Sequence, residues 1–140
     1  MNLLDSDILT LVYHGRPGLT ERVSAAQAAG LVALPLVVRL EALRGRIEAV
    51  LKAATAAELL AAQERLEKTE SFLTQFPVVR FDDRSATEFD RLRADKKFKK
   101  LGRDDLLIAS IALSTGATLV TRNTKDFAPI PGLTVENWAD

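Results

Sequence analysis

Short apolar runs alternate with longer segments of helical character along this chain. Residues 1–4, 31–34, 78–81 and 117–121 are apolar or β-branched runs of the length typical of buried strands, and residues 133–137 are a fifth candidate. Strands that alternate with helices predict an α/β fold. In such a fold a mostly parallel sheet of about four or five strands is covered by helices on both faces.

Proline and glycine set the expected helix ends. Pro35 is expected in the first turn of a helix, where its missing N–H costs nothing, and Gly45 is expected to end that helix. Apolar side chains from Ala62 to Phe76 are spaced four, three, four, three, which predicts one buried helical stripe. Residues 106–113 are apolar almost all round, so their helix should be buried on most sides. The expected helices cover residues 8–13, 20–29, 35–45, 47–76, 83–100 and 104–115.

Composition narrows the class of protein. The 140 residues suffice for one compact domain, 1–140, and 47% are hydrophobic and 27% charged, as in globular proteins. No apolar run reaches the length of a membrane helix, and the N-terminus lacks the pattern of a secretory signal, so we expect a cytoplasmic protein. With no cysteine and a single histidine, His14, thiolate sites, typical zinc sites and two-histidine ribonuclease chemistry are excluded. A net charge of zero argues weakly against a general nucleic-acid coat protein.

Carboxylates recur at the positions where an α/β fold places its functional crevice, beyond the carboxyl ends of the strands. Asp5 follows the first strand, and Asp126 lies just beyond the strand at 117–121. Asp105 opens the buried helix that precedes that strand. Glu41 follows Val37 and Val38 by one helical turn, so it belongs to the stripe that faces the core.

Each acid alone has an ordinary explanation as a turn residue, a helix cap, a loop carboxylate or the partner of an arginine. Together they suggest a bound cation, because unpaired buried carboxylates are costly. Hard oxygen ligands select Mg²⁺ or Mn²⁺. Like-charge repulsion in such a site should raise some of the carboxyl pKa values.

Four segments carry a resemblance to a known family. They are "LLDSDIL", "VVRLEALRG", "GRDDLLIASIALSTGATLVTRNTKDF" and "PGLTVENW". In this order they resemble the PIN-domain ribonucleases, most closely the VapC-type toxins of toxin–antitoxin pairs. Ser6 stands where that family usually has Thr, and Pro35 where a Ser often caps the helix that bears the glutamate. The resemblance implies a PIN-like three-layer α/β/α domain.

Site residues follow from the resemblance position by position. It implies that Asp5, Glu41, Asp105 and Asp126 are the four catalytic acids. Asp5 and Asp105 would bind the metal, and Glu41 and Asp126 would reach it through water. The residues that would line the same cleft are Ser6, Asp104, Thr121 and Asn123.

The implied activity is Mg²⁺- or Mn²⁺-dependent endoribonuclease chemistry, as in the toxin of a VapBC-type module. The ion would activate water for attack on phosphorus, leaving 5′-phosphate and 3′-hydroxyl ends. Attack by the ribose 2′-hydroxyl is disfavoured because the chain has no pair of histidines. The implied partners are an RNA substrate, a cognate VapB-type antitoxin and a second copy in a homodimer.

A basic stretch adjoins Asp105 in sequence. "RLRADKKFKKLGR" has seven Lys or Arg in thirteen positions, which would hold an RNA backbone without sequence choice. A solvated helix face is the alternative. The RNA-binding candidates are Lys96, Lys97, Lys99, Lys100, Arg103, Arg122 and Lys125.

Two other functions remain open. Asp5 and Asp7 are spaced like the nucleophile and acid of haloacid dehalogenase-type phosphatases, although position 9 is Leu where that motif has Thr or Val. The chain is also short for that fold with its cap. A catalytically silent domain that binds RNA or protein is the second alternative.

Overall fold

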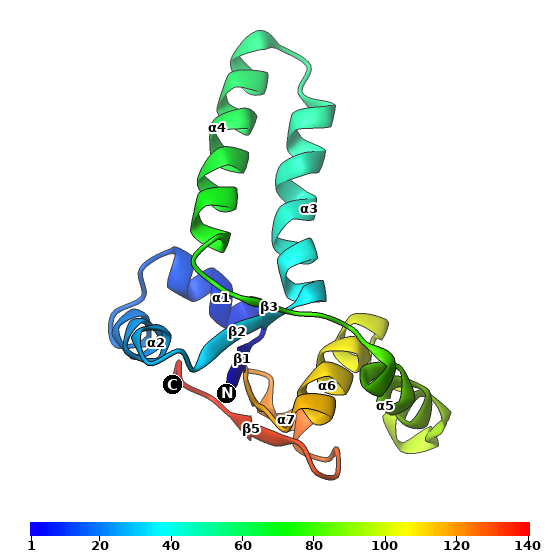
Figure 1. Ribbon diagram of the computed structural model, residues 1–140. Helices are drawn as coiled ribbons and strands as arrows, with labels where there is room; N and C mark the ends of the chain where they lie inside the picture. The colour runs from blue at the N-terminus through cyan, green and yellow to red at the C-terminus, as the bar shows by residue number, and fades with distance from the viewer.

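Five parallel strands form the central sheet of the computed structural model, which describes residues 1–140 (Figure 1). Across the sheet the order is β3, β2, β1, β4, β5, and all four pairings are parallel. The expected parallel sheet of four or five strands is thereby confirmed. The strands are β1 (Asn2–Leu4), β2 (Val32–Pro35), β3 (Val78–Val79), β4 (Thr118–Val120) and β5 (Thr134–Glu136).

Seven α-helices and one 3₁₀ helix connect the strands. The 3₁₀ helix is η1 (Lys96–Phe98), so the helix expected over 83–100 ends earlier than predicted. The α-helices are α1 (Ser6–Tyr13), α2 (Leu19–Ala28), α3 (Leu36–Lys52), α4 (Ala56–Leu73), α5 (Asp83–Ala94), α6 (Arg103–Thr115) and α7 (Thr124–Phe127).

The direction of each crossover decides which face of the sheet its helices cover. The connections β1 to β2 and β2 to β3 step one way along the sheet, and β3 to β4 steps the other way. Because such crossovers are almost always right-handed, α1–α4 and α5–α6 belong to opposite faces. Figure 1 shows α1 and α2 on one side of the strands and α5 and α6 on the other. This is the expected three-layer α/β/α arrangement.

The prediction that a helix ends at Gly45 is wrong. The helix α3 continues through Gly45 to Lys52, and the chain reverses at residues 53–55, so the single helix expected over 47–76 is also wrong. The break is set by a helix cap: the Thr55 hydroxyl accepts from the amide of Glu58 at 3.1 Å. Figure 1 shows α3 and α4 as an antiparallel pair that projects away from the sheet.

Pro35 also differs from its expected place. It is the last residue of β2 and the residue before α3, with φ −59° and ψ 144°, so its backbone is extended rather than helical. The proline ring accepts this φ without strain. The polypeptide therefore passes from strand to helix without a loop, and Glu41 lies less than two turns into the helix.

The core lies between the sheet and its helices. The central strands β1 and β2 are buried, and α6 is buried on most sides, as its sequence predicts. The stripe that ends at Phe76 is largely buried too. No helix in the structure is long and apolar enough to cross a membrane.

Candidate active site

The strand order reverses between β1 and β4, and the site forms at their carboxyl ends. Asp5 directly follows β1, and its amide donates to the carbonyl of Val120 in β4 at 2.9 Å. Thr121 directly follows β4, and its hydroxyl donates to Oδ2 of Asp5 at 2.8 Å. The other oxygen of Asp5 caps α1 by accepting from the amide of Ser6 at 2.7 Å. Both Asp5 and Thr121 are buried.

Glu41 reaches the same end of the sheet from α3. The hydroxyl of Ser6 donates to Oε1 of Glu41 at 3.1 Å, joining residues 35 positions apart. The side chain is half-buried, as its position on the core-facing stripe predicts. Ser6 thus contacts Asp5 through its amide and Glu41 through its hydroxyl.

The helix α6 brings two further acids. Asp104 and Asp105 lie in its first turn, where the helix dipole favours negative charge. Asp104 pairs with Arg103 at 3.6 Å, whereas the carboxylate of Asp105 has neither a hydrogen bond nor an ion pair. Asp105 is therefore the acid with the least local compensation.

Asp126 is held near the site by the short helix α7. Its Oδ2 accepts from the side-chain amide of Asn123 at 3.0 Å, and the backbone amide of Asn123 donates to the hydroxyl of Thr121 at 3.0 Å. A chain of hydrogen bonds thus runs from Asp126 through Asn123 and Thr121 to Asp5.

Burial raises three carboxyl pKa values at this edge, and neighbouring acids raise them further. Burial is the largest cause at Asp5, with Asp7 and Asp105 adding to it while the Thr121 hydrogen bond opposes it. Burial also leads the rise in the pKa of Glu41, where Asp104 and Asp5 contribute. The pKa of Asp105 rises through burial and through Asp126, Asp104 and Asp7. Acids from α1, α3, α6 and α7 therefore share one electrostatic environment.

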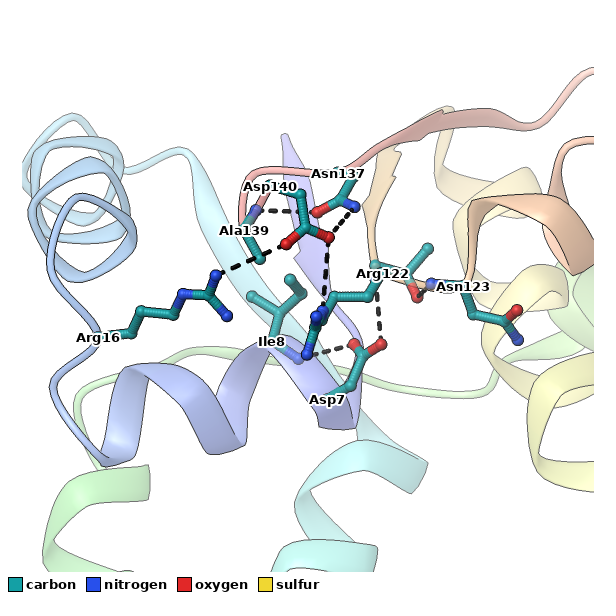
Figure 2. A network of polar contacts seen from close by, with 9 residues as sticks. Asp7, Ile8, Arg16, Arg122, Asn123, Asn137, Ala139 and Asp140 are labelled. Carbon is teal, nitrogen blue, oxygen red and sulfur yellow. Dashed lines mark hydrogen bonds and ion pairs between the residues drawn. The ribbon is translucent and has the colours of Figure 1, made fainter.

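Asp7 also belongs to this environment, although it is not among the predicted site residues. Its Oδ1 accepts from the amide of Ile8 at 2.7 Å, and its Oδ2 accepts from the amide of Arg122 at 3.1 Å (Figure 2). The carboxylate thereby ties the start of α1 to the loop that carries Thr121 and Asn123. Its sequence signal is the spacing two residues after Asp5, which also matches the phosphatase motif.

The donor set fits a hard divalent cation by its chemistry. Every candidate ligand is a carboxylate or hydroxyl oxygen, and three of the carboxyl pKa values are raised in part by neighbouring acids. No group of three acidic or histidine side chains lies close enough to ligate one ion directly. Mg²⁺ is commonly held through one or two carboxylates and keeps several waters, so direct ligation by three side chains is not required.

The basic candidates divide into two groups. Lys96, Lys97, Lys99 and Lys100 are exposed, lie in or beside η1 just before α6, and form no ion pair. Arg103 pairs with Asp104. The remaining two lie beyond β4. The guanidinium of Arg122 pairs with Asp140 at 3.6 Å, beside the Arg16–Asp140 pair, and Lys125 is exposed on α7 (Figure 2).

Comparison with known proteins identifies relatives. The "Ribonuclease VapC2" of Rickettsia felis is 38% identical over 78 residues, covering 54% of this chain and 58% of that protein. The "tRNA(fMet)-specific endonuclease VapC" of Salmonella typhimurium is 33% identical over 81 residues, covering 56% of this chain and 61% of that protein. These alignments span less than two thirds of either relative.

A solved structure matches over a longer range. A crystal structure of VapBC2 from Rickettsia felis, bound to a DNA fragment from its promoter, superposes with a TM-score of 0.78 at 27% identity over 98% of both chains. The PIN domain family matches residues 3–133, which makes the phosphatase alternative untenable. The sequence, the parallel sheet and the acids at its carboxyl edge agree with this match, and the chain belongs to the PIN domain family.

Proposed function

We propose that this chain is a metal-dependent endoribonuclease, the toxin of a VapBC-type toxin–antitoxin module, acting as one domain over residues 1–140. The observation that carries the proposal is the group of acids at the carboxyl ends of β1 and β4, where three carboxyl pKa values are raised by burial and by neighbouring acids. Membership of the PIN family and the likeness to ribonucleases named VapC support it. A silent binding domain would have no need of this repulsion.

The proposed cofactor is Mg²⁺ or Mn²⁺. Asp5 and Asp105 would hold it directly, since the charge of Asp105 raises the pKa of Asp5 and Asp105 has no other partner. Glu41 and Asp126 would act through bridging water. When bound, the ion would lower the pKa of a nearby water molecule and offset charge on the phosphoryl oxygens.

The surrounding side chains would keep this arrangement in place. Thr121 and the Ser6 amide fix both oxygens of Asp5, and the Ser6 hydroxyl fixes Glu41. Asn123 orients Asp126. Hydrolysis would break the bond between phosphorus and the 3′ oxygen, leaving a 3′-hydroxyl and a 5′-phosphate.

RNA would be held by the lysines that precede α6. Four exposed lysines without ion-pair partners lie next in sequence to the helix that carries Asp105. Replacing Lys96, Lys97, Lys99 and Lys100 by Ala should lower the slope of log affinity against log salt by up to about 0.7 per lost phosphate contact. Fluorescence anisotropy with a single-stranded RNA measures this slope. An unchanged slope would mean that these lysines form only a solvated surface.

The proposed protein partner is a VapB-type antitoxin. VapBC complexes are among the solved structures similar to this chain. The α3–α4 pair also exposes large apolar side chains, including Leu51 at 79% and Leu60 at 70%, as surfaces that bind partners do. RNA cleavage under antitoxin control would take place in the cytoplasm.

Cleavage of single-stranded RNA by the purified chain tests the proposal. The wild type with Mn²⁺ or Mg²⁺ should produce 5′-phosphate ends, and EDTA, Asp5→Ala or Asp105→Asn should abolish cleavage. Asp90→Asn is the matched control, because Asp90 is exposed on α5. Products with 2′,3′-cyclic phosphate ends, or cleavage that survives EDTA, would contradict the mechanism. Binding without cleavage would favour the silent domain.

A further inference from the structure

A pocket of about 250 Å³ opens beside the acidic site, between α1, α3 and α4. Glu41 forms part of its wall and accepts a hydrogen bond from Ser6, so the pocket and the acids share a side chain. The pocket walls also include Leu9 and Thr10, one turn beyond Ser6 on α1. The nucleotide next to a phosphate held at the acids would therefore lie close to the pocket.

One side of the pocket is aromatic. Tyr13 on α1 and Phe72 on α4 both line it, with ring centroids 5.1 Å apart in an edge-to-face arrangement. His14, whose ring is 5.3 Å from that of Tyr13, is exposed at the same side. Aromatic side chains of this kind are the surfaces on which unpaired RNA bases stack.

Arg46 on α3 also lines the pocket and supplies directed hydrogen-bond donors. Its Nε donates to the hydroxyl of the buried Thr69 at 3.2 Å, which fixes the plane of the guanidinium. The two terminal nitrogens have no hydrogen-bond partner and no ion pair, although the side chain is half-buried. A fixed guanidinium with unused donors suits a ligand that presents two neighbouring acceptors.

We propose that this pocket binds one unpaired nucleobase of the RNA, next to the phosphate that is cleaved, and that it prefers guanine. The proposal rests on the proposed ribonuclease function. Guanine presents O6 and N7 as adjacent acceptors for the Arg46 donors, whereas adenine places an amino donor beside N7. Unpaired cytosine also has two adjacent acceptors, O2 and N3, but its single ring has less area to contact Tyr13 and Phe72. The pocket volume admits a single base, so the preference should be confined to one nucleotide position.

An antitoxin segment is the competing occupant, and the pocket's polarity argues against it. An apolar side chain would leave the Arg46 donors unsatisfied, and unsatisfied buried donors are costly. A base with two acceptors satisfies them while its ring contacts Tyr13 and Phe72. The nucleotide is therefore the better match to both the aromatic rings and the Arg46 donors.

Nucleotide binding by the full chain tests the proposal without depending on cleavage. Titration with GMP, AMP, CMP and UMP is followed by the amide resonances of Thr10 and Ala42. The phosphate is common to all four probes, so a difference among them reports the base. GMP should bind at least about tenfold more tightly than AMP and UMP, the scale of one bidentate base contact, and more tightly than CMP.

Two substitutions separate base recognition from simple charge. Arg46→Gln should lower GMP affinity about tenfold or more, and Arg46→Lys, which keeps the charge without the planar fork, should bind all four nucleotides equally. Arg65→Gln is the matched control, because Arg65 is an exposed arginine of α4 outside this pocket and should leave GMP binding unchanged. Thermal denaturation of each variant establishes that it is folded.

The outcomes distinguish this proposal from the ribonuclease proposal. Equal affinity for the four nucleotides in the wild type, or GMP binding that survives Arg46→Gln, would overturn the guanine pocket. It would also be overturned if Arg46→Gln left GMP binding unchanged and weakened only the complex with a co-expressed antitoxin. Selective GMP binding without RNA cleavage would instead retain the pocket and reject the nuclease. Where cleavage occurs, mapped sites should share a guanine that Arg46→Lys no longer requires.

Discussion

At the level of single residues, Asp105 is a carboxylate of the site with neither a hydrogen bond nor an ion pair. Burial and three neighbouring acids raise its pKa, and no hydrogen bond opposes them. Asp105→Asn should therefore abolish cleavage and raise the melting temperature at pH 7, by a few degrees at most because solvent screens a partly exposed carboxylate. Thermal denaturation with EDTA present measures the gain, and Asp90→Asn should show none.

The same conflict fixes the sign of the pH dependence. A carboxyl whose pKa is raised on folding favours the folded state only while it is protonated. Its contribution to the free energy of unfolding is therefore lost as the pH rises from the ordinary value of 3.8 through the raised pKa. The stability difference between Asp105→Asn and the wild type should vanish below about pH 3. A difference that persists undiminished there would mean that the conflict is not electrostatic.

Asp7 is expected to act as a positioning residue. Its carboxylate accepts from the amides of Ile8 and Arg122, and the second bond holds the loop that presents Thr121 and Asn123 (Figure 2). Asp7→Ala should cost about 1–3 kcal/mol and speed hydrogen exchange at the Arg122 amide. Asp7→Asn keeps an acceptor oxygen and should restore part of that protection. Unchanged exchange in Asp7→Ala would show that the loop is held by other contacts.

The sequence could reveal some of these residues and not others for a physical reason. Glu41 interrupts an apolar stripe, and Asp5 ends a buried strand, so each stands out against its neighbours. Asp7 lies in the first turn of a helix, where an acid is ordinary. Its importance comes from Arg122, 115 residues away, and no local pattern reports such a contact.

At the level of elements, Gly45 shows how a local rule fails. Glycine often ends helices, but Gly45 lies inside α3 with an ordinary helical φ, and a Cβ added there would meet no atom within 4 Å. Gly45→Ala should thus stabilise the protein by about 1 kcal/mol, because alanine loses less backbone entropy in a helix. Chemical denaturation measures the change.

Gly116 provides the matched comparison for Gly45. It ends α6 with a φ of +65°, a conformation that suits glycine and strains alanine. Gly116→Ala should lower stability by about 1 kcal/mol although a Cβ would also find open space there. Equal effects at the two positions would contradict this account. The sequence thus predicts that helices form here. The continuation of α3 through Gly45 depends on its packing against α4.

At the level of the whole molecule, the alternation of strands and helices was enough to predict the parallel sheet and its functional edge. The strand order, with β1 between β2 and β4, places residues from both ends of the chain together. Asp5 and Thr121 meet there although 116 positions separate them. The partners of the projecting α3–α4 pair could not be predicted from packing, because its apolar residues Leu51 and Leu60 are mostly exposed.

The α3–α4 pair should also mediate the expected homodimer. Leu51 and Leu60 lie near its tip and are 79% and 70% exposed, which is unfavourable in an isolated molecule. Light scattering should give twice the chain mass of 15.3 kDa for the wild type. The double substitution Leu51→Ser, Leu60→Ser should give the single mass, because it removes apolar area that dimerisation would bury. Leu31→Ser, at a residue 46% exposed outside this pair, should remain dimeric. A monomeric wild type, or a dimer that survives the double substitution, would assign this apolar surface to the antitoxin alone.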